Sequence, residues 1–292
     1  MKLSIITINY NNAEGLKRTL ESVASQKNRE FEHIIIDGGS SDGSVPIIKS
    51  YEESIITNRV NNKTQYPLIT WLSERDGGIY SAMNKGIKRA NGEYIQILNS
   101  GDILAAPYVT ERMIHALNSL NAHSLKNKIG IPILYGNMIK KDYSTGKIIG
   151  RSTEVEYSLR QYYYSTMNHD CCYMRRDLFE TYGLYDESLK IVSDWKWFLQ
   201  AIGLGEVKPV YVDIDVTIFD ASGISESNLA LRNEERRQVL EEVLPPAVLA
   251  DYDAHAFEME QMNRLRRHHI YWLVYFIERI LFKLEKWHVL RN

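Results

Sequence analysis

Three aspartates stand at or just after the ends of short apolar runs of the sequence, each near glycine and small polar residues. They are Asp37, Asp76 and Asp102, and the runs before them cover residues 31–36, 68–72 and 94–98. Apolar runs of this length, ended by polar and glycine-containing segments, are typical of buried strands. A carboxylate at a strand end can hold a divalent cation or accept hydrogen bonds from N–H and O–H groups. The pattern predicts a nucleotide site, with two acids on the base and ribose and a metal at the third.

The rest of the first hundred residues supplies the elements that would bring these aspartates together. A further apolar run covers residues 3–8 and ends in the polar turn Asn9-Tyr10-Asn11-Asn12. Helical patterns lie at about residues 13–26, from about 45 and at 79–90, whereas the polar residues 58–65 are typical of a loop. Strands that alternate with helices form a parallel sheet, so their carboxyl ends share one edge. We therefore expect one cleft at that edge.

The second half of the chain has a different pattern. A helix is predicted over residues 108–120, and residues 133–140 and 147–149 are typical of an antiparallel hairpin. Residues 207–219 are predicted to form two short strands separated near Asp213, and another helix starts at Ser193-Asp194. The predicted fold class is therefore α/β, with a mostly parallel sheet flanked by helices in the first half and mixed strands in the second.

Two of the acids also have a purely structural interpretation. Asp102 could cap the helix expected near Pro107, and Ser193 or Asp194 lies in the capping region of its own helix. Taken alone, the sequence around Asp102 leaves both interpretations open. For Asp194 they are compatible, because a capping carboxylate is held rigidly.

The composition is that of an ordinary globular protein. The chain has 292 residues, of which 44% are hydrophobic and 25% charged, and its formal net charge is −2. This size predicts one large domain with an appendage, and the charge gives no reason to expect nucleic acid as a partner. The adjacent Cys171 and Cys172 cannot form a disulfide framework, and the N-terminal apolar run is too short for a signal peptide. A cytoplasmic location fits best.

Three classes of nucleotide-binding protein are disfavoured. A dinucleotide-binding fold needs the pattern Gly-x-Gly-x-x-Gly after its first strand, but the turn at residues 9–12 has no glycine. The sequence also lacks a Walker-type loop, and a nucleotidyltransferase would need a glycine-rich basic loop after the first strand.

Five segments, taken in order, resemble the motifs of one known family. They are SIITINYN at 4–11, IIDGGSSDGS at 35–44, SERDGGIYSAMNKG at 73–86, ILNSGD at 97–102 and GLYDESLKIVSDWKWFL at 183–199. Together they resemble family 2 glycosyltransferases of the GT-A fold, which has a Rossmann-like, mostly parallel sheet. The resemblance implies a GT-A catalytic domain at 1–225, with a nucleotide-binding half at 1–102 and an acceptor-binding half at 103–225. Residues 226–292 would then be a helical C-terminal extension.

The resemblance also implies which residues hold the donor, a nucleoside diphosphate sugar. The nucleoside would be contacted by Thr7, Asn9 and Asp37, with Asp37 on the base, and Asp76 would lie near the base or ribose. Asn84 or Lys85 would lie near the sugar or the diphosphate. UDP is the favoured nucleotide because it is the commonest in the family, and GDP is the alternative.

Ser100-Gly101-Asp102 takes the place of the family's Asp-x-Asp motif, with a serine instead of the first acid. A hydroxyl can still bond a ribose or a metal-bound water, so Ser100 and Gly101 stay in the predicted donor site. Asp102 is the predicted ligand of a divalent metal, Mn²⁺ or Mg²⁺, which would stabilise charge on the diphosphate.

Transfer also needs a base that takes the proton from an acceptor hydroxyl. In the family this is an acid at the start of a helix in the second half, and Asp194 matches it. Direct displacement of this kind inverts the anomeric centre, as the resemblance implies. His169 and Trp195 are candidates for contact with the acceptor or the diphosphate, although each also has an ordinary structural interpretation, as a hydrogen-bonding histidine and a core tryptophan.

Two further segments have predicted roles. The small residues Ser222-Gly223-Ile224-Ser225 could close over bound donor. From Ser227 the chain is predicted to be helical, interrupted at Pro245-Pro246, and its last helix carries apolar and basic residues in an amphipathic pattern. That helix would lie on a membrane surface, pack on the catalytic domain or pair with a second subunit. Its apolar run at 270–277 is too short to span a bilayer.

The sequence thus predicts an inverting, metal-dependent glycosyltransferase that moves a hexose-type sugar to a glycan or lipid-linked acceptor. The expected setting is assembly of a surface polysaccharide such as a capsule or O-antigen, in the cytoplasm or peripherally on the inner face of the membrane. The alternative is a non-catalytic nucleotide-sugar or partner-binding module of the same fold, which the serine at position 100 motivates.

Overall fold

The computed structural model describes residues 2–123, 130–155, 157–221, 228–267 and 269–289. The chain divides into two compact units, Met1–Arg237 and Gln238–Asn292, which are described separately. The expected mobile loop at 222–225 lies outside the described residues. A domain boundary after residue 225 stays a prediction.

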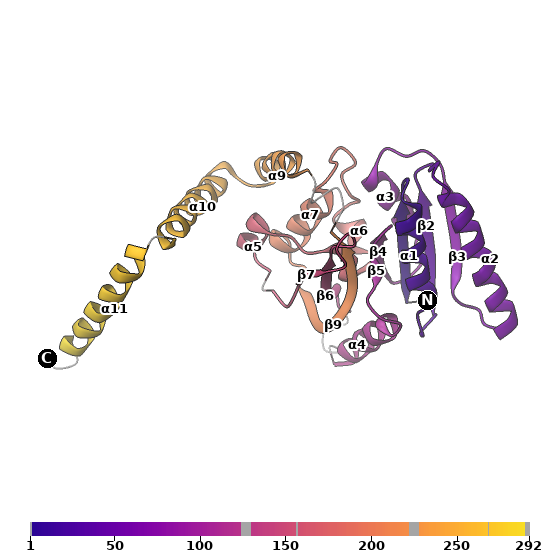
Figure 1. Cartoon of the computed structure of the whole chain (residues 1–292), viewed down its shortest axis with the longest axis horizontal. Coiled ribbons are helices and arrows are strands. Elements are labelled where there is room, and N and C mark those ends of the chain that lie inside the picture. Colours follow the sequence, from indigo (N-terminus) through magenta and orange to yellow (C-terminus); the bar gives the residue numbers. More distant parts are fainter. Residues whose placement is uncertain (1, 124–129, 156, 222–227, 268, 290–292) are drawn as a thin grey trace. The chain divides into compact units, whose positions relative to one another are not determined.

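The first unit contains the parallel sheet that the sequence predicts (Figure 1). Its strands are β1 (Leu3–Asn9), β2 (Phe31–Asp37), β3 (Leu68–Ser73) and β4 (Tyr94–Asn99), in the spatial order β3-β2-β1-β4 and parallel throughout. The connecting helices are α1 (Ala13–Ala24), α2 (Ser44–Asn62) and α3 (Ile79–Arg89). α2 runs through most of the segment expected to be a loop at 58–65, so that expectation was wrong, because the polar side chains there lie on an exposed helix end.

Helices cover both faces of this sheet, which explains why every residue of β1 and β2 is buried. On one face, Leu16 and Leu20 of α1 and Ile48 of α2 pack with Ile35 of β2 in one apolar cluster. On the other face, α3 approaches β1 so closely that a Cβ at Gly86 would overlap Ile6. Helices therefore pack on both faces of the sheet, and the polar ends of its strands lie at one edge.

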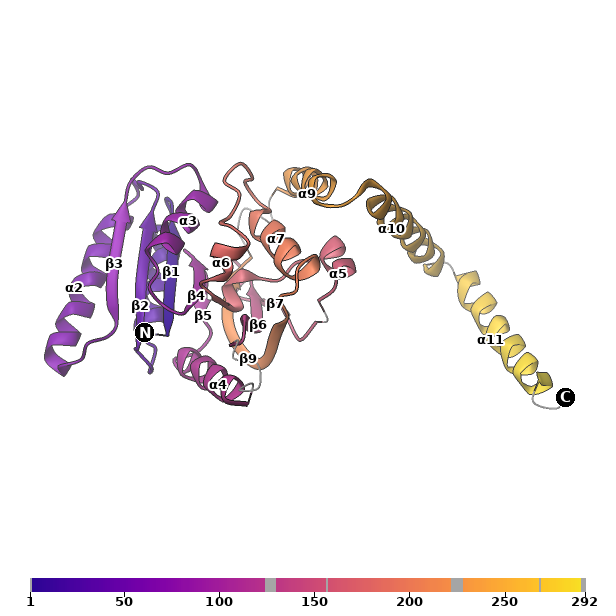
Figure 2. The same ribbon diagram turned by 180° about the vertical axis from the view of Figure 1, so that it is seen from behind.

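The second half of the first unit extends the same sheet with mixed strands (Figure 2). Its elements are β5 (Ile103–Leu104), α4 (Val109–His123), β6 (Ile133–Lys141), β7 (Ile148–Arg151), α5 (Leu159–Tyr164), the 3₁₀ turn η1 (His169–Cys171), β8 (Cys172–Arg175), α6 (Leu178–Thr181), α7 (Ser193–Phe198), the π-helical turn η2 (Leu199–Gly203) and β9 (Pro209–Asp220). β8 lies antiparallel between β4 and β6, and β6 with β7 forms the expected hairpin.

One expectation for this half was wrong. Residues 209–220 form the single strand β9, not two strands separated near Asp213. β9 runs beside β6, and the irregularity is absorbed as shifts of register around Asn137, next to Gly136, which packs against the backbone of Ile214. Asp213 itself is tied to Arg151 by an ion pair of 2.9 Å, so it does not end the strand.

The C-terminal segment is helical, as expected. The helices are α9 (Leu229–Val243), α10 (Pro246–Arg266) and α11 (His269–Val289), and Pro246 occupies the first turn of α10. Large apolar side chains of α11, among them Trp272, Phe276 and Phe282, are exposed. In the described part of the chain, no helix is long and apolar enough to cross a membrane.

His33 makes the stability of the first unit depend on pH. Its buried ring lies 2.9 Å from Thr7 Oγ1 and 2.9 Å from Tyr51 Oη, and burial lowers the pKa of His33 to about 3. Between that value and the ordinary pKa of about 6.5, the unfolded chain binds a proton that the folded chain does not. The unfolding free energy therefore falls as the pH falls below about 6.5.

We expect this loss to reach up to about 1.4 kcal/mol per pH unit for His33. A His33→Gln variant, which cannot take up the proton, should lose less stability than the wild type between pH 7 and pH 5 in urea unfolding. His115→Gln, at an exposed position of α4, is the control and should follow the wild type. Equal pH slopes for all three proteins would contradict the assignment.

Candidate active site

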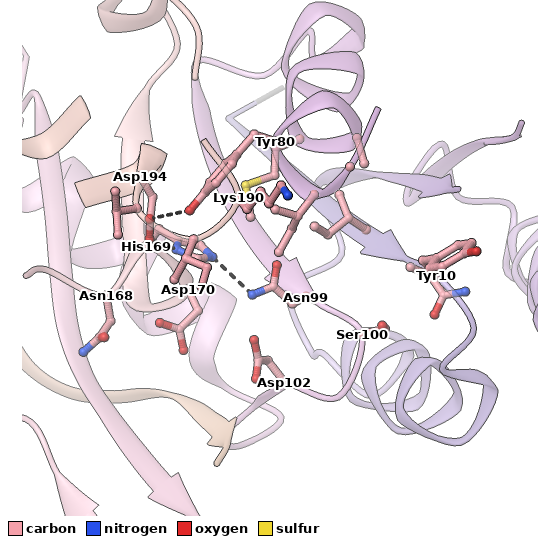
Figure 3. A pocket seen from close by; sticks show the side chains of 18 of the residues that line it. Tyr10, Tyr80, Asn99, Ser100, Asp102, Asn168, His169, Asp170, Lys190 and Asp194 are labelled. Carbon is pink, nitrogen blue, oxygen red and sulfur yellow. Dashed lines mark hydrogen bonds and ion pairs between the residues drawn. The ribbon is translucent and has the colours of Figure 1, made fainter. Parts of the chain in front are cut away.

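A cavity of about 810 Å³ lies at the carboxyl edge of the parallel strands. Of the residues predicted to form the site, it is lined by Asn9, Asp76, Ser100, Asp102, His169, Asp194 and Trp195. Figure 3 shows Tyr10 at one side of this cavity and Asp194 at the other. Residues that are far apart in the sequence thus share one enclosure.

The carboxylate of Asp37 is buried and fully engaged at the end of β2. Its Oδ1 accepts hydrogen bonds from Asn9 Nδ2 at 2.7 Å and Ser40 Oγ at 2.6 Å, and its Oδ2 accepts from Ser40 N at 3.0 Å and Ser73 Oγ at 2.7 Å. Burial alone would raise the pKa of Asp37, but these bonds more than offset it and hold the pKa below its usual value. Asp37 thus remains ionised and fixes Asn9, whose own Oδ1 is buried without a partner among the described residues.

Tyr10 and Asp76 flank Gly38 just beyond these strand ends. A Cβ at Gly38 would lie 3.0 Å from Asp76 Oδ2 and 3.2 Å from the Tyr10 ring, so only glycine leaves this slot open. The Tyr10 side chain is 67% exposed, which leaves a free aromatic face at the cavity wall. An aromatic face beside a carboxylate and an amide oxygen is suited to a flat, polar ring such as a nucleobase.

The Ser100-Gly101-Asp102 turn is held in place by α1. Thr19 Oγ1 accepts from Gly101 N at 2.9 Å and donates to Asp102 O at 2.7 Å, and Asn12 Nδ2 donates to Ser100 O at 2.8 Å. Gly101 has a φ of 114°, a left-handed conformation that a side chain would strain. The turn is therefore rigid before any ligand arrives.

Asp102 is not a helix cap, because α4 begins only at Val109 and the Asp102 carboxylate bonds elsewhere. Its Oδ1 accepts from Asp220 N at 3.0 Å, and its buried Oδ2 has no hydrogen-bond partner among the described residues. Burial, followed by the nearby charge of Asp170, raises the pKa of Asp102. A cation on the unpartnered oxygen would relieve both penalties.

The Asp102 carboxylate fits a divalent metal that the protein and the substrate phosphates hold together. No group of three or more potential ligands is gathered in the described part of the chain. Mg²⁺ commonly binds through one or two carboxylates together with the phosphates of a substrate, which needs no such group. One buried, unpartnered carboxylate oxygen facing a cavity meets that requirement.

At the other side of the cavity, the carboxylate of Asp194 is held by two donors from separate elements. Tyr80 Oη of α3 donates to Oδ1 at 2.9 Å, and His169 Nδ1 donates to Oδ2 at 2.9 Å. Val192 takes the N-cap position of α7, so Asp194 stands in the first turn and is not the cap. The carboxylate is therefore oriented by one side chain from α3, in the first half of the unit, and one from η1, in the second half.

His169 and Asp194 each favour the charged form of the other. Burial raises the pKa of Asp194, but the hydrogen bond and charge of His169 outweigh it, and the net pKa is lowered. Burial likewise lowers the pKa of His169, yet its bond to Asp194 raises the net value. Asn99 Nδ2 lies 3.3 Å from His169 Nε2, and its unpartnered Oδ1 could accept from a protonated ring if the amide turned over.

Five predicted residues do not line the cavity: Thr7, Asp37, Asn84, Lys85 and Gly101. Thr7 bonds His33, and Asn84 Nδ2 donates to Tyr185 O at 2.9 Å and to Glu187 Oε1 at 2.9 Å. Lys85 pairs with Glu74 at 2.9 Å. These contacts organise the walls of the site, and direct contact of the five with a donor stays a prediction.

Sequence reasoning missed several cavity residues, namely Tyr10, Tyr80, Asn99, Asp170 and Arg236. Tyr80 follows Gly77-Gly78 at the start of α3, and Asn99 ends β4, so strand-end position alone would have selected Asn99. Tyr80 and Arg236 had no such signal, because their roles depend on contacts with residues more than forty positions away.

Comparison with known proteins shows the family to which the chain belongs. A family model described as Glycosyl transferase family 2 matches residues 4–183. A glycosyltransferase of Mycobacterium tuberculosis, described as uncharacterized, is 30% identical over 225 residues, which cover 76% of this chain and 76% of the relative. A PGL/p-HBAD biosynthesis glycosyltransferase of Mycobacterium bovis is 24% identical over 75% of this chain and 77% of its own length. The chain belongs to glycosyltransferase family 2.

Solved structures show the same fold. S. aureus TarS 1-349 in complex with UDP-GlcNAc superposes with a TM-score of 0.60 at 21% identity, over 82% of this chain and 64% of that one. The mannosyltransferase PcManGT of Pyrobaculum calidifontis, in complex with GDP-Man and Mn²⁺, gives a TM-score of 0.60 at 15% identity, over 88% of this chain and 69% of that one. In a UDP complex of TarS 1-349 the match spans 60% of the TarS chain. The fold is therefore GT-A, as expected.

The pairing of His169 with Asp194 can be checked by NMR. We expect the His169 ring to titrate above pH 6.5 in the wild type, since Asp194 favours its charged form. In Asp194→Asn that support is lost, so the pKa of His169 should fall from its wild-type value. The ring of His33 in the same spectra is the internal control and should not move. A His169 titration that is unchanged by the substitution would contradict the pairing.

Proposed function

We propose that this glycosyltransferase is metal-dependent and inverting, and that it moves a hexose-type sugar from a nucleoside diphosphate to a glycan or lipid-linked acceptor. The carrying observation is that Asp194, oriented by Tyr80 and His169, faces the same cavity as the unpartnered oxygen of Asp102. A base and an acid that can hold a diphosphate through a metal, both lining one cavity, are what in-line displacement requires.

The nucleoside would occupy the slot at Gly38. In this arrangement the base stacks on Tyr10, and Asn9 Oδ1 and the Asp76 carboxylate accept hydrogen bonds from base N–H or ribose O–H groups. Asp37 would act through Asn9 and Ser40, and it could bond the base directly only after one of them moved. UDP is favoured, in keeping with TarS bound to UDP-GlcNAc, and GDP is the alternative, in keeping with PcManGT bound to GDP-Man.

Asp102 would hold the metal, with Ser100 lining the cavity beside it. When bound, a divalent cation neutralises charge that develops on the departing diphosphate. The contribution of the chain is rigidity, because Thr19 and Asn12 fix the turn and Gly101 allows its conformation. That PcManGT was solved with Mn²⁺ supports the same kind of metal here.

In the transfer step, the acceptor oxygen attacks the anomeric carbon as the bond from that carbon to the diphosphate oxygen breaks. The attack comes from the face opposite the leaving group, so the configuration inverts. Asp194 takes the hydroxyl proton, and His169 and Tyr80 keep its carboxylate aimed at the acceptor. Trp195, the next residue, also lines the cavity and would contact the acceptor.

Donor binding tests the metal site. Calorimetric titration with UDP and GDP, each with Mn²⁺ and with chelator, should show metal-dependent binding of one nucleotide. Asp102→Ala should lose that binding, because it removes the unpartnered carboxylate oxygen. Asp251→Ala, at an exposed position of α10, is the matched control and should bind as the wild type does. If neither nucleotide binds under any condition, the donor assignment fails.

Removal of the base separates catalysis from binding. Asp194→Asn keeps the shape of the side chain but cannot accept the proton, so turnover should fall by about 10²–10⁴-fold while the affinity for the donor nucleotide persists. Sugar transfer or donor hydrolysis, measured as release of nucleoside diphosphate, reports the loss. Unchanged turnover would remove Asp194 from the mechanism, and a wild type that binds donor but never turns over would favour the non-catalytic module.

The lipid-linked acceptor gives α11 a proposed role at the surface of the cytoplasmic membrane. Its exposed Trp272, Phe276 and Ile280 are spaced along one side of the helix, and Arg279 and Lys283 provide positive charge. We expect the full chain to float with anionic liposomes and a chain ended before Asn263 to stay in solution. Should the full chain stay in solution with liposomes while the shorter chain aggregates, α11 serves protein packing or subunit pairing instead.

A further inference from the structure

Arg236 of α9 is a half-buried cation whose described contacts are all neutral. Its Nη2 donates to the carbonyl oxygens of Tyr162 at 3.0 Å, Tyr163 at 3.1 Å and Ser165 at 3.3 Å. Its Cζ lies 4.5 Å from the centre of the Trp195 ring. Within the described residues, no ion pair joins this guanidinium to a carboxylate. Charges away from water are ordinarily paired, so the missing counter-charge requires an explanation.

Two further basic residues line the cavity near Arg236. Arg232, one helical turn earlier, and Lys190 also line the cavity. Burial, and then the charge of Arg232, lower the pKa of Arg236 to about 10. Figure 3 shows Lys190 among the side chains that line the cavity. Three cationic residues therefore contribute to one part of the wall.

The buried acid that precedes Arg236 in the sequence, Glu235, bonds backbone groups. Glu235 Oε1 accepts from Lys190 N at 2.7 Å, and its Oε2 accepts from Ile191 N at 2.9 Å. These two bonds fasten the 190–191 backbone to α9. Glu235 thereby keeps Lys190 close to α9, which carries Arg232 and Arg236. Both of its carboxylate oxygens accept hydrogen bonds from backbone N–H groups.

This cationic wall lies on the acceptor side of the site. Arg236 stacks on Trp195, which directly follows the base Asp194, and Lys190 comes four residues before Asp194. The donor diphosphate belongs at Asp102, which is on a different element at the end of β4. A ligand that contacts Arg236 would therefore be the molecule whose hydroxyl meets Asp194.

We infer that Arg236, with Arg232 and Lys190, binds a phosphate or diphosphate group of the acceptor, close to the hydroxyl that Asp194 activates. Arginine forks bind phosphate oxygens in pairs, and three cations suit a group with more than one negative charge better than a single carboxylate. The inference rests on the proposed function for its identification of the acceptor side. It narrows the acceptor to a phosphorylated one, such as a sugar on a lipid diphosphate.

Binding of inorganic pyrophosphate to the full chain tests this site. Calorimetry is done in chelator, so that the metal-dependent donor site does not contribute. We expect Arg236→Gln to bind about tenfold more weakly than the wild type, because a charged hydrogen bond is lost. Arg237→Gln, the adjacent exposed arginine that does not line the cavity, should bind normally, as should Asp102→Ala.

A second variant guards against misfolding of Arg236→Gln. Lys190 is exposed, so Lys190→Gln should fold normally and weaken binding by about threefold. Absence of pyrophosphate binding, or equal affinity in wild type, Arg236→Gln and Lys190→Gln, overturns the inference. Loss in Asp102→Ala alone also overturns it, because the anion would then bind at the donor site. Failure of UDP and GDP to bind with Mn²⁺ is a separate result, and it would overturn the proposed function without removing an anion site at Arg236.

Discussion

Hydrogen bonding between β1, β2 and β4 in parallel register places Asn9, Asp37 and Asn99 at one edge of the sheet. Because helices cover both faces of the sheet, polar groups of these strands can meet a ligand only at an edge, and the cavity lies at the carboxyl edge. Burial at this edge disfavours the charged form of each carboxylate, so each needs hydrogen bonds or an opposite charge. Asp37 has four hydrogen bonds, and Asp194 is bonded by Tyr80 and His169. Asp102 has a partner for only one of its two oxygens.

Two charged residues of the cavity, one acidic and one basic, lack an oppositely charged partner among the described residues. Asp102 keeps one buried oxygen unsatisfied, which favours a cation, whereas Arg236 is a half-buried guanidinium among neutral groups, which favours an anion. The two lie on separate elements that line one cavity, at the end of β4 and on α9. A cavity with opposite unmet charges suits two substrates that approach from different sides.

Local sequence was sufficient for the strands of the parallel half, because buried apolar runs end there in polar, glycine-containing segments, although it ended α2 too early. It placed Asp102 at the end of a strand, whereas Asp194 was selected through the family resemblance. It failed where a contact distant in sequence decides the outcome. β9 remains one strand because its extra residues between Tyr211 and Thr217 are accommodated as register shifts opposite Gly136 and Asn137 of β6. Tyr80 matters only because α7 brings Asp194 to it. Likewise Thr7 and Asn84, which the family pattern favoured, turned out to bond His33 and Tyr185 in the walls.

The antiparallel insertion of β8 between β4 and β6 has a consequence for engineering. It joins the two halves through backbone hydrogen bonds, with Tyr94 opposite Arg175 and Ile95 opposite Met174. One continuous sheet leaves no hinge at which the halves could part. A chimera that exchanged everything after Asp102 with a relative would therefore set a foreign β8 against the native β4. Substitutions of single residues that line the cavity would leave this strand pairing in place.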